Sequence, residues 1–195
     1  HKYIAGIDEA GRGALFGPVV AVSVVFPPEI IIDSRESWLT SITDSKCLSP
    51  TQRLHLARII LAHARSIGVG ISTHREIDRI NIYWASLEAM KRAVSDMTIQ
   101  PDYLLVDGFP IKGIHHQQRG VPQGDRKCTL IAAASILAKV LRDNVLFRLD
   151  KEYQGYGLAR HKGYATEAHY EALELLGPSE MHRHSFKLGR QLKFW

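Results

Sequence analysis

Cysteine is scarce in this sequence. Only Cys47 and Cys128 occur among 195 residues, and they do not form a Cys-x-x-Cys pair. No export signal precedes the first apolar segment, and together these features favour a reducing cytoplasm over a disulfide framework. We therefore expect a cytoplasmic protein with two free thiols.

Long hydrophobic runs are also absent. No apolar stretch approaches the roughly 20 residues that a membrane helix needs, which excludes a membrane-spanning segment. The sequence has no internal repeat, low-complexity tract or long Gly/Ser linker. At 45% hydrophobic and 23% charged residues, the composition is that of a globular protein with one sizeable core and room for a small appendage.

The charge balance is basic. Lys and Arg number 25 against 20 Asp and Glu, which gives a formal net charge of +5, and there are ten histidines besides. Such a balance favours a polyanionic partner, although many basic proteins bind no nucleic acid.

Hydrophobic patterns predict a mixed α/β core of four strands and three helices. The expected strands are 2–8, 19–26, 68–73 and 102–108, and the expected helices are 48–66, 75–97 and 128–153. Ser49 and Pro50 provide an N-cap and a first residue for the helix over 48–66. The segment 27–38 is interrupted by proline, serine and charged residues and is expected to be a loop. The helix over 75–97 has apolar residues at three- and four-residue spacing, namely Ile77, Ile80, Trp84, Leu87, Met90 and Val94.

The character of the chain changes after residue 153. Residues 154–195 are rich in glycine and histidine, with one expected helix near 166–176. We predict a core domain over 1–153 and a small, mostly helical or irregular appendage over 154–195.

Four acidic residues stand where packing alone does not explain them. Asp8 and Glu9 end the first strand, and Asp107 ends another, at the edge where α/β sheets usually hold ligands. Neighbouring strand residues face opposite sides, so the first two share a site only if the chain turns at once. Gly11 and Gly13 permit such a turn.

The fourth acidic residue, Asp143, falls in one helical stripe with Ser135 and Lys139. Each acidic position also has a simpler interpretation. The strand-end pair can be solvated charges, Asp107 can mark a turn, and Asp143 can be the surface partner of Lys139. Spacing alone leaves these alternatives open. A dinucleotide-binding turn is disfavoured because Gly17 comes one residue late and a β-branched run follows it.

Several segments together resemble the type 2 ribonucleases H, in the bacterial ribonuclease HII branch. The signature is GIDEAGRGALFGPVVAVSVV at 6–25, and the match continues in order through ITDSKCLSP (42–50), IDRINIYWASLEAMKRAV (77–94), LLVDG (104–108), GDRKCTLIAAASILAKVLRD (124–143), HKGYATEAH (161–169) and GPSEMHRHSF (177–186). The resemblance covers nearly the whole chain.

This resemblance implies a ribonuclease-H-like mixed sheet flanked by helices. It also implies hydrolysis of RNA paired with DNA, and incision 5′ of single ribonucleotides in duplex DNA that leaves 3′-hydroxyl and 5′-phosphate ends. The implied catalytic metal ligands are Asp8, Glu9, Asp107 and Asp143. Two Mg²⁺ or Mn²⁺ ions about 3.5–4 Å apart suit this chemistry, because hard ions prefer oxygen ligands and can activate water and stabilise the leaving oxygen.

The resemblance also implies how the substrate is read. Gly11, Arg12 and Gly13 are expected to contact the ribose 2′-hydroxyl together with Tyr164, and Lys46 is expected to contact the nucleic-acid backbone. Further charge for phosphates is expected from Lys139, Arg142 and Lys162. One departure from the family pattern is Cys128, which replaces a serine and would hold substrate more weakly if that serine does so.

Two other functions and one further partner are compatible with parts of the sequence. A noncatalytic nucleic-acid-binding module would leave the carboxylates unexplained, and a zinc enzyme would need histidine spacings that are missing. The C-terminal QLKFW resembles peptides that dock on the bacterial sliding clamp, and the contacts would be made by Gln191, Leu192, Phe194 and Trp195. The alternative is that these residues pack on the appendage. We expect a monomer.

Overall fold

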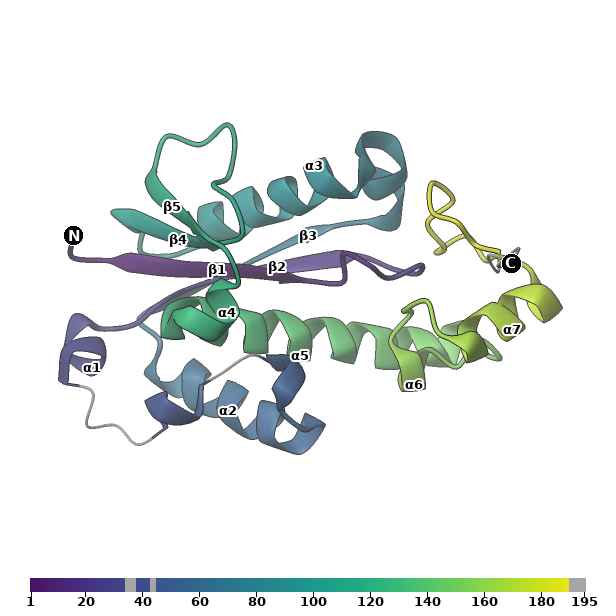
Figure 1. The fold of residues 1–195 in the computed structure, drawn as a ribbon, viewed down its shortest axis with the longest axis horizontal. Helices are drawn as coiled ribbons and strands as arrows, with labels where there is room; N and C mark the ends of the chain where they lie inside the picture. Colours follow the sequence, from purple (N-terminus) through teal and green to yellow (C-terminus); the bar gives the residue numbers. More distant parts are fainter. Residues whose placement is uncertain (34–37, 43–44, 190–195) are drawn as a thin grey trace, which may run out of the picture.

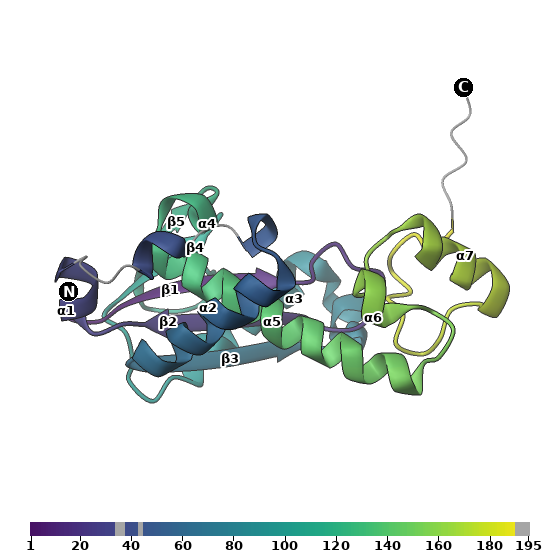
Figure 2. The same ribbon diagram turned by 90° about the horizontal axis from the view of Figure 1, so that it is seen from below.

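A computed structural model describes residues 1–33, 38–42 and 45–189 of the chain. It contains one twisted sheet with helices on both faces, and a smaller helical part lies beyond one end of the sheet (Figures 1 and 2). No helix in the described ranges is both long and apolar enough to cross a membrane.

The sheet has five strands in the order β3-β2-β1-β4-β5. Strands β1 (Ile4–Ala10), β2 (Val19–Val25) and β3 (Ser66–Ser72) are antiparallel neighbours. Strands β4 (Tyr103–Asp107) and β5 (Gln117–Val121) continue from β1 in parallel. The mixed sheet predicted from the sequence is confirmed. Every residue of β2 is buried, because helices cover both faces of the sheet.

Helices form two apolar layers with this sheet. Helix α3 (His74–Ser95) covers one face, and α2 (Pro50–His63) with α5 (Thr129–Glu152) covers the other (Figure 1). The cap predicted at Ser49 is confirmed, since its side chain accepts the backbone N–H of Gln52. Burial of apolar surface is the dominant favourable contribution to folding, and these two layers provide it on both faces of the sheet.

Helix α3 is interrupted at Asn81, whose φ of 63° is not helical. The Asn81 side chain accepts the backbone N–H groups of Tyr83 and Trp84, so it caps a second helical segment. The interruption changes the phase of the helix. Trp84, which was predicted on the apolar face, is therefore 45% exposed, and Ala85 is buried instead.

Other segments differ from the sequence prediction. Residues expected to be a loop form helix α1 (Pro28–Asp33), which Pro28 begins and Glu29 supports in its first turn. Strand β5 was not predicted, because it is a polar, partly exposed edge strand without apolar alternation. Short helices α4 (Gly124–Lys127) and α6 (Leu158–His161) were also missed.

The C-terminal part contains α6 and α7 (Glu167–Leu176), and it packs on the end of α5 that extends past the sheet (Figure 1). Its apolar cluster also includes the β1–β2 loop and comprises Leu15, Phe16, Leu146, Tyr156, Leu158, Ala172 and Leu173. Isolated strand-like bridges join Ala14 to Tyr164 and Phe16 to His182. The loop and the appendage are thus built together, and the domain boundary at 153 stays a prediction.

Candidate active site

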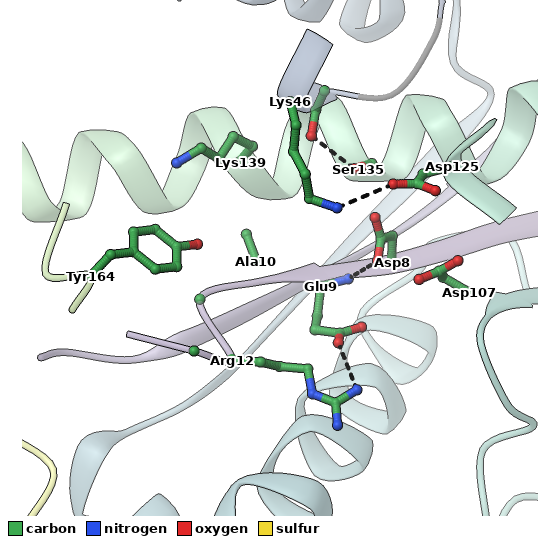
Figure 3. Close-up of a pocket in the computed structure, with 13 residues that line it drawn as sticks. Asp8, Glu9, Ala10, Arg12, Lys46, Asp107, Asp125, Ser135, Lys139 and Tyr164 are labelled. Atoms are coloured by element: carbon green, nitrogen blue, oxygen red, sulfur yellow. Dashed lines mark hydrogen bonds and ion pairs between the residues drawn. The ribbon is translucent and has the colours of Figure 1, made fainter. Parts of the chain in front are cut away.

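A polar pocket of about 280 Å³ opens where β1 and β4 end (Figure 3). It gathers residues from the two strands, the β1–β2 loop, the helices α4 and α5, a short 3-10 helix (Ser45–Cys47) and the C-terminal part. The residues that line it are Asp8, Glu9, Ala10, Gly11, Arg12, Gly13, Ser45, Lys46, Asp107, Asp125, Ser135, Lys139 and Tyr164.

Asp8 and Asp107 meet because their strands run parallel and in register. Ile7 of β1 is paired with Val106 of β4, so the next residue of each strand falls at the same edge of the sheet. The Asp107 carboxylate accepts the backbone N–H of Gly124 at 2.7 Å, and Asp8 accepts that of Glu9 at 2.7 Å. Backbone donors therefore fix one oxygen of each carboxylate.

Glu9 reaches the same pocket from the other face of β1. Figure 3 shows Asp8 directed toward α5 and Glu9 toward Arg12, as strand alternation requires. The Glu9 carboxylate lies 3.4 Å from Nη1 of Arg12. Strand β1 continues to Ala10, beyond the end of β4, so both side chains border one opening without the immediate turn that the sequence led us to expect.

Asp125 is a fourth pocket carboxylate, and it was not predicted from the sequence. It lies on α4, is 7% exposed, and its Oδ2 is 3.4 Å from Nζ of Lys46. Its neighbour Gly124 donates to Asp107, which ties α4 to the end of β4. The only available signal was its place in the GDRK segment, because no apolar strand or helical stripe leads to it.

The structure does not bring Asp143 to the other carboxylates. It lies eight residues after Ser135 on α5, about 12 Å along a helix with a 1.5 Å rise per residue. Ser135, unlike Asp143, lines the pocket together with Asp8. The oxygens of Asp143 lie 2.7 Å from Lys139 Nζ and 3.8 Å from Arg53 Nη1. Asp143 therefore neutralises cations beside the pocket and does not line it.

The pocket concentrates negative charge. Burial raises the pKa of the Asp8 carboxyl well above its usual value, and the charges of Glu9 and Asp107 raise it further. Burial also raises the pKa of Glu9, although Arg12 opposes this effect. The positive charge near these carboxylates is too small to stabilise their ionised forms fully. A bound cation would supply the missing positive charge.

The donor set fits a hard divalent cation. Four carboxylates from three elements surround the pocket, and oxygen is the ligand that Mg²⁺ and Mn²⁺ prefer. Within the described residues no three metal-ligating side chains are arranged closely enough to enclose an ion. Each carboxylate is instead held by a protein donor.

Two fully buried arginines hold the glycine-rich loop. Arg142 donates to the carbonyl oxygens of Phe16, Pro18 and Lys162 at 2.9–3.1 Å. Arg183 donates to the carbonyls at 12 and 17, both at 2.9 Å. Buried loop carbonyls are thereby satisfied by charged donors, which fixes the path of the backbone. Arg142 was predicted to contact phosphate, and its complete burial shows that this prediction is wrong.

Gly11 and Gly13 of the glycine-rich loop have different surroundings. Gly11 has a φ of +100°, and the Arg142 side chain fills the space that a Cβ would need. Gly13 has no neighbour within 4 Å of such a Cβ, so its backbone is open to the pocket. Tyr164 faces the pocket from the C-terminal part, with Lys139 and Arg142 against its ring at 5.3 and 5.2 Å.

The remaining predicted cations and histidines lie as follows. Lys46 and Lys139 line the pocket, whereas the Lys162 ammonium donates to the carbonyl of Ala159. His169 and His182 are buried and hydrogen-bonded to each other.

Comparison with known proteins points to one family. A family model described as Ribonuclease HII matches residues 5–189. A ribonuclease HII of Trichodesmium erythraeum is 49% identical over 183 residues, which are 93% of this chain and 85% of that protein.

Solved structures share the fold. The RNase HII in a structure of the PCNA:RNase HII complex from Archaeoglobus fulgidus is 27% identical, with a TM-score of 0.78 over 97% of both chains. Bst-RNase HIII, solved in complex with Mn²⁺, is 18% identical, with a TM-score of 0.66 over 95% of this chain and 67% of that one. The second likeness concerns the fold alone.

Proposed function

This chain belongs to the ribonuclease HII family, and from that premise we propose that its pocket hydrolyses the RNA strand of RNA–DNA hybrids and incises duplex DNA 5′ of single ribonucleotides. The reaction would leave 3′-hydroxyl and 5′-phosphate ends. One observation carries the proposal: four carboxylates, the open backbone of Gly13 and the ring of Tyr164 line the same pocket.

The metal ligands in this proposal are Asp8, Glu9, Asp107 and Asp125, and the ions are two Mg²⁺ or Mn²⁺. Asp125 takes the place that the sequence analysis gave to Asp143, because Asp125 lines the pocket. Bound ions would supply an activated water and stabilisation of the leaving oxygen. The raised pKa of Asp8 supports this assignment, since a bound cation would stabilise the ionised form that burial and the neighbouring carboxylates disfavour.

Recognition of the ribonucleotide is assigned to the backbone of residues 11–13 and to Tyr164. A backbone without a Cβ at Gly13 lets a sugar hydroxyl approach within hydrogen-bonding distance, and the 2′-hydroxyl is what separates RNA from DNA. The Tyr164 ring offers a flat surface for the sugar or base. Lys46, at the rim with its side chain 77% exposed, can contact a phosphate.

The test compares two duplexes of identical sequence, one with a single ribonucleotide and one entirely of DNA. We expect a nick 5′ of the ribonucleotide in Mg²⁺ or Mn²⁺, no cleavage in EDTA, and no cleavage of the all-DNA duplex. Asp8→Asn should abolish the nick. Cleavage in EDTA, or equal cleavage of both duplexes, would contradict the proposal.

A sliding clamp remains a proposed partner. The residues predicted to contact it, Gln191, Leu192, Phe194 and Trp195, lie outside the described residues. Pull-down on a bacterial clamp, comparing the full chain with a version that lacks residues 191–195, tests this proposal. Equal recovery would contradict it.

A further inference from the structure

Three histidines of the C-terminal part make hydrogen bonds that determine where each ring carries its proton. His169 and His182 are fully buried, and the His161 and His169 rings stack with centroids 4.3 Å apart. None of the three is among the residues that line the pocket.

The proton of His182 is assigned by a backbone group. Nδ1 of His182 accepts the N–H of Ser179 at 2.9 Å, and a backbone N–H can only donate. A neutral ring with Nδ1 as acceptor carries its proton on Nε2. That Nε2 lies 3.1 Å from Nε2 of His169, so His182 donates to His169.

The proton of His169 follows from the same reasoning. Its Nε2 accepts from His182, and its Nδ1 lies 3.0 Å from the carbonyl oxygen of Tyr164, which can only accept. Nδ1 therefore carries the proton. The bonds run in one direction, from the Ser179 amide through His182 and His169 to the Tyr164 carbonyl, and we name these two rings the histidine relay.

Neighbouring bonds reach the same backbone. His161 donates from Nε2 to the carbonyl of Tyr156 at 2.7 Å and accepts the N–H of Gly163 at Nδ1, at 3.2 Å. On the other side, Gly163 accepts the N–H of Leu15 at 2.8 Å. The backbone at 163–164 is thus held between the histidines and the glycine-rich loop.

We propose that His169 and His182 are positioning residues for Tyr164: as neutral rings of opposite tautomer, they fix the backbone that carries the Tyr164 ring at the pocket. The relay needs both rings neutral, because an added proton on either would place two N–H groups against each other. Burial lowers the pKa of both rings, that of His182 to about 4, so both are neutral near neutral pH.

This inference rests on the proposed function, in which Tyr164 reads the ribonucleotide. Its first test is direct. ¹⁵N NMR of the imidazole groups in the full chain, at about pH 7, should show His169 protonated on Nδ1 and His182 on Nε2. The same tautomer in both rings, or a charged ring, would overturn it.

The second test uses amide isosteres. The amide nitrogen of Asn occupies roughly the place of Nδ1, and that of Gln the place of Nε2. His169→Asn keeps the donor to Tyr164 and His169→Gln removes it. We expect kcat/KM on the single-ribonucleotide duplex to fall about tenfold in His169→Gln and less than about threefold in His169→Asn, since small misplacements of a contacting group are costly. Equal losses would overturn the inference.

A double-mutant cycle separates positioning from general stability. If His169 acts through Tyr164, His169→Gln should cause no further loss in a Tyr164→Ala background. A tenfold loss caused by His169→Gln in the Tyr164→Ala background would overturn the inference and leave the proposed function standing. An unchanged rate for Tyr164→Ala itself would contradict the proposed role of that tyrosine and remove the basis of the inference.

The same comparison at His182 guards against a variant that fails to fold. Gln at this position keeps a donor toward His169, and Asn does not. His182→Gln should remain close to the wild-type rate while His182→Asn falls, and the reverse order would overturn the inference.

Discussion

The Arg142 side chain occupies the space that a Cβ on Gly11 would need, and its guanidinium donates to three carbonyls of the surrounding backbone. One buried cation therefore sets the turn that follows Asp8 and Glu9. The need for glycine at this position comes from the positive φ and from Arg142, whereas the need at Gly13 comes from access to the pocket.

This difference predicts separate outcomes for two alanine variants. Gly11→Ala should lower the free energy of unfolding by about 2–4 kcal/mol, because it strains a positive φ and displaces a buried arginine. Gly13→Ala meets no neighbour and should change stability by less than about 1 kcal/mol, while reducing incision at a ribonucleotide. Urea unfolding and nicking assays of both variants measure these effects. A Gly13→Ala variant with wild-type incision would contradict the recognition role.

Acidification should weaken the fold through His182. Its pKa in the folded protein is lowered to about 4 by burial and by neighbouring His169, against an ordinary value of 6.5. Between these two values the unfolded chain binds more protons than the folded one. The free energy of unfolding therefore falls as pH is lowered through this window, by at most about 1.4 kcal/mol per pH unit for one ring.

Asp8 and Glu9 act in the opposite direction, because their raised pKa values favour the folded state at low pH. A comparison with His182→Gln isolates the imidazole, since this variant leaves both carboxylates in place. The difference in the free energy of unfolding between wild type and variant should change across pH 4 to 6.5. A constant difference would show that His182 does not titrate in this range.

Cys128 is a weak helix start that can be improved. It is the N-cap of α5, and its side chain makes no capping hydrogen bond. Serine accepts a backbone N–H at this position, so Cys128→Ser should raise the free energy of unfolding by about 0.5–1.5 kcal/mol. Urea unfolding measures this change, with exposed Cys47→Ser as the control. A gain of the same size in the control would contradict the capping explanation.

Local patterns predicted most of the fold. Apolar strands and capped helices have signals within a few residues, as Ser49 and Pro50 illustrate at the start of α2. The polar edge strand β5 and the interruption of α3 at Asn81 lacked such signals. The first is stabilised by its pairing with β4, and the second depends on a side-chain cap that period counting does not detect.

The candidate site was predicted in part. Asp8, Glu9 and Asp107 follow from strand ends, and the structure places all three in one pocket. Asp125 depends on how the short helix α4 docks on the end of β4, which is a tertiary relationship. Ser135, Lys139 and Asp143 do lie along one helix, as predicted. Because they are four residues apart, each lies about 6 Å further along the helix axis than the one before, which places Asp143 away from the strand ends.

The most direct test of the proposed metal site is a comparison of Asp125→Asn with Asp143→Asn, measured as the Mg²⁺-dependent rate of nicking at a single ribonucleotide. Asp125→Asn should reduce the rate by roughly a hundredfold or more, because it removes a carboxylate that would face the ions. Asp143→Asn should retain the rate within about fivefold, since its partners are Lys139 and Arg53. The opposite order of these losses would contradict the assignment of the four metal ligands.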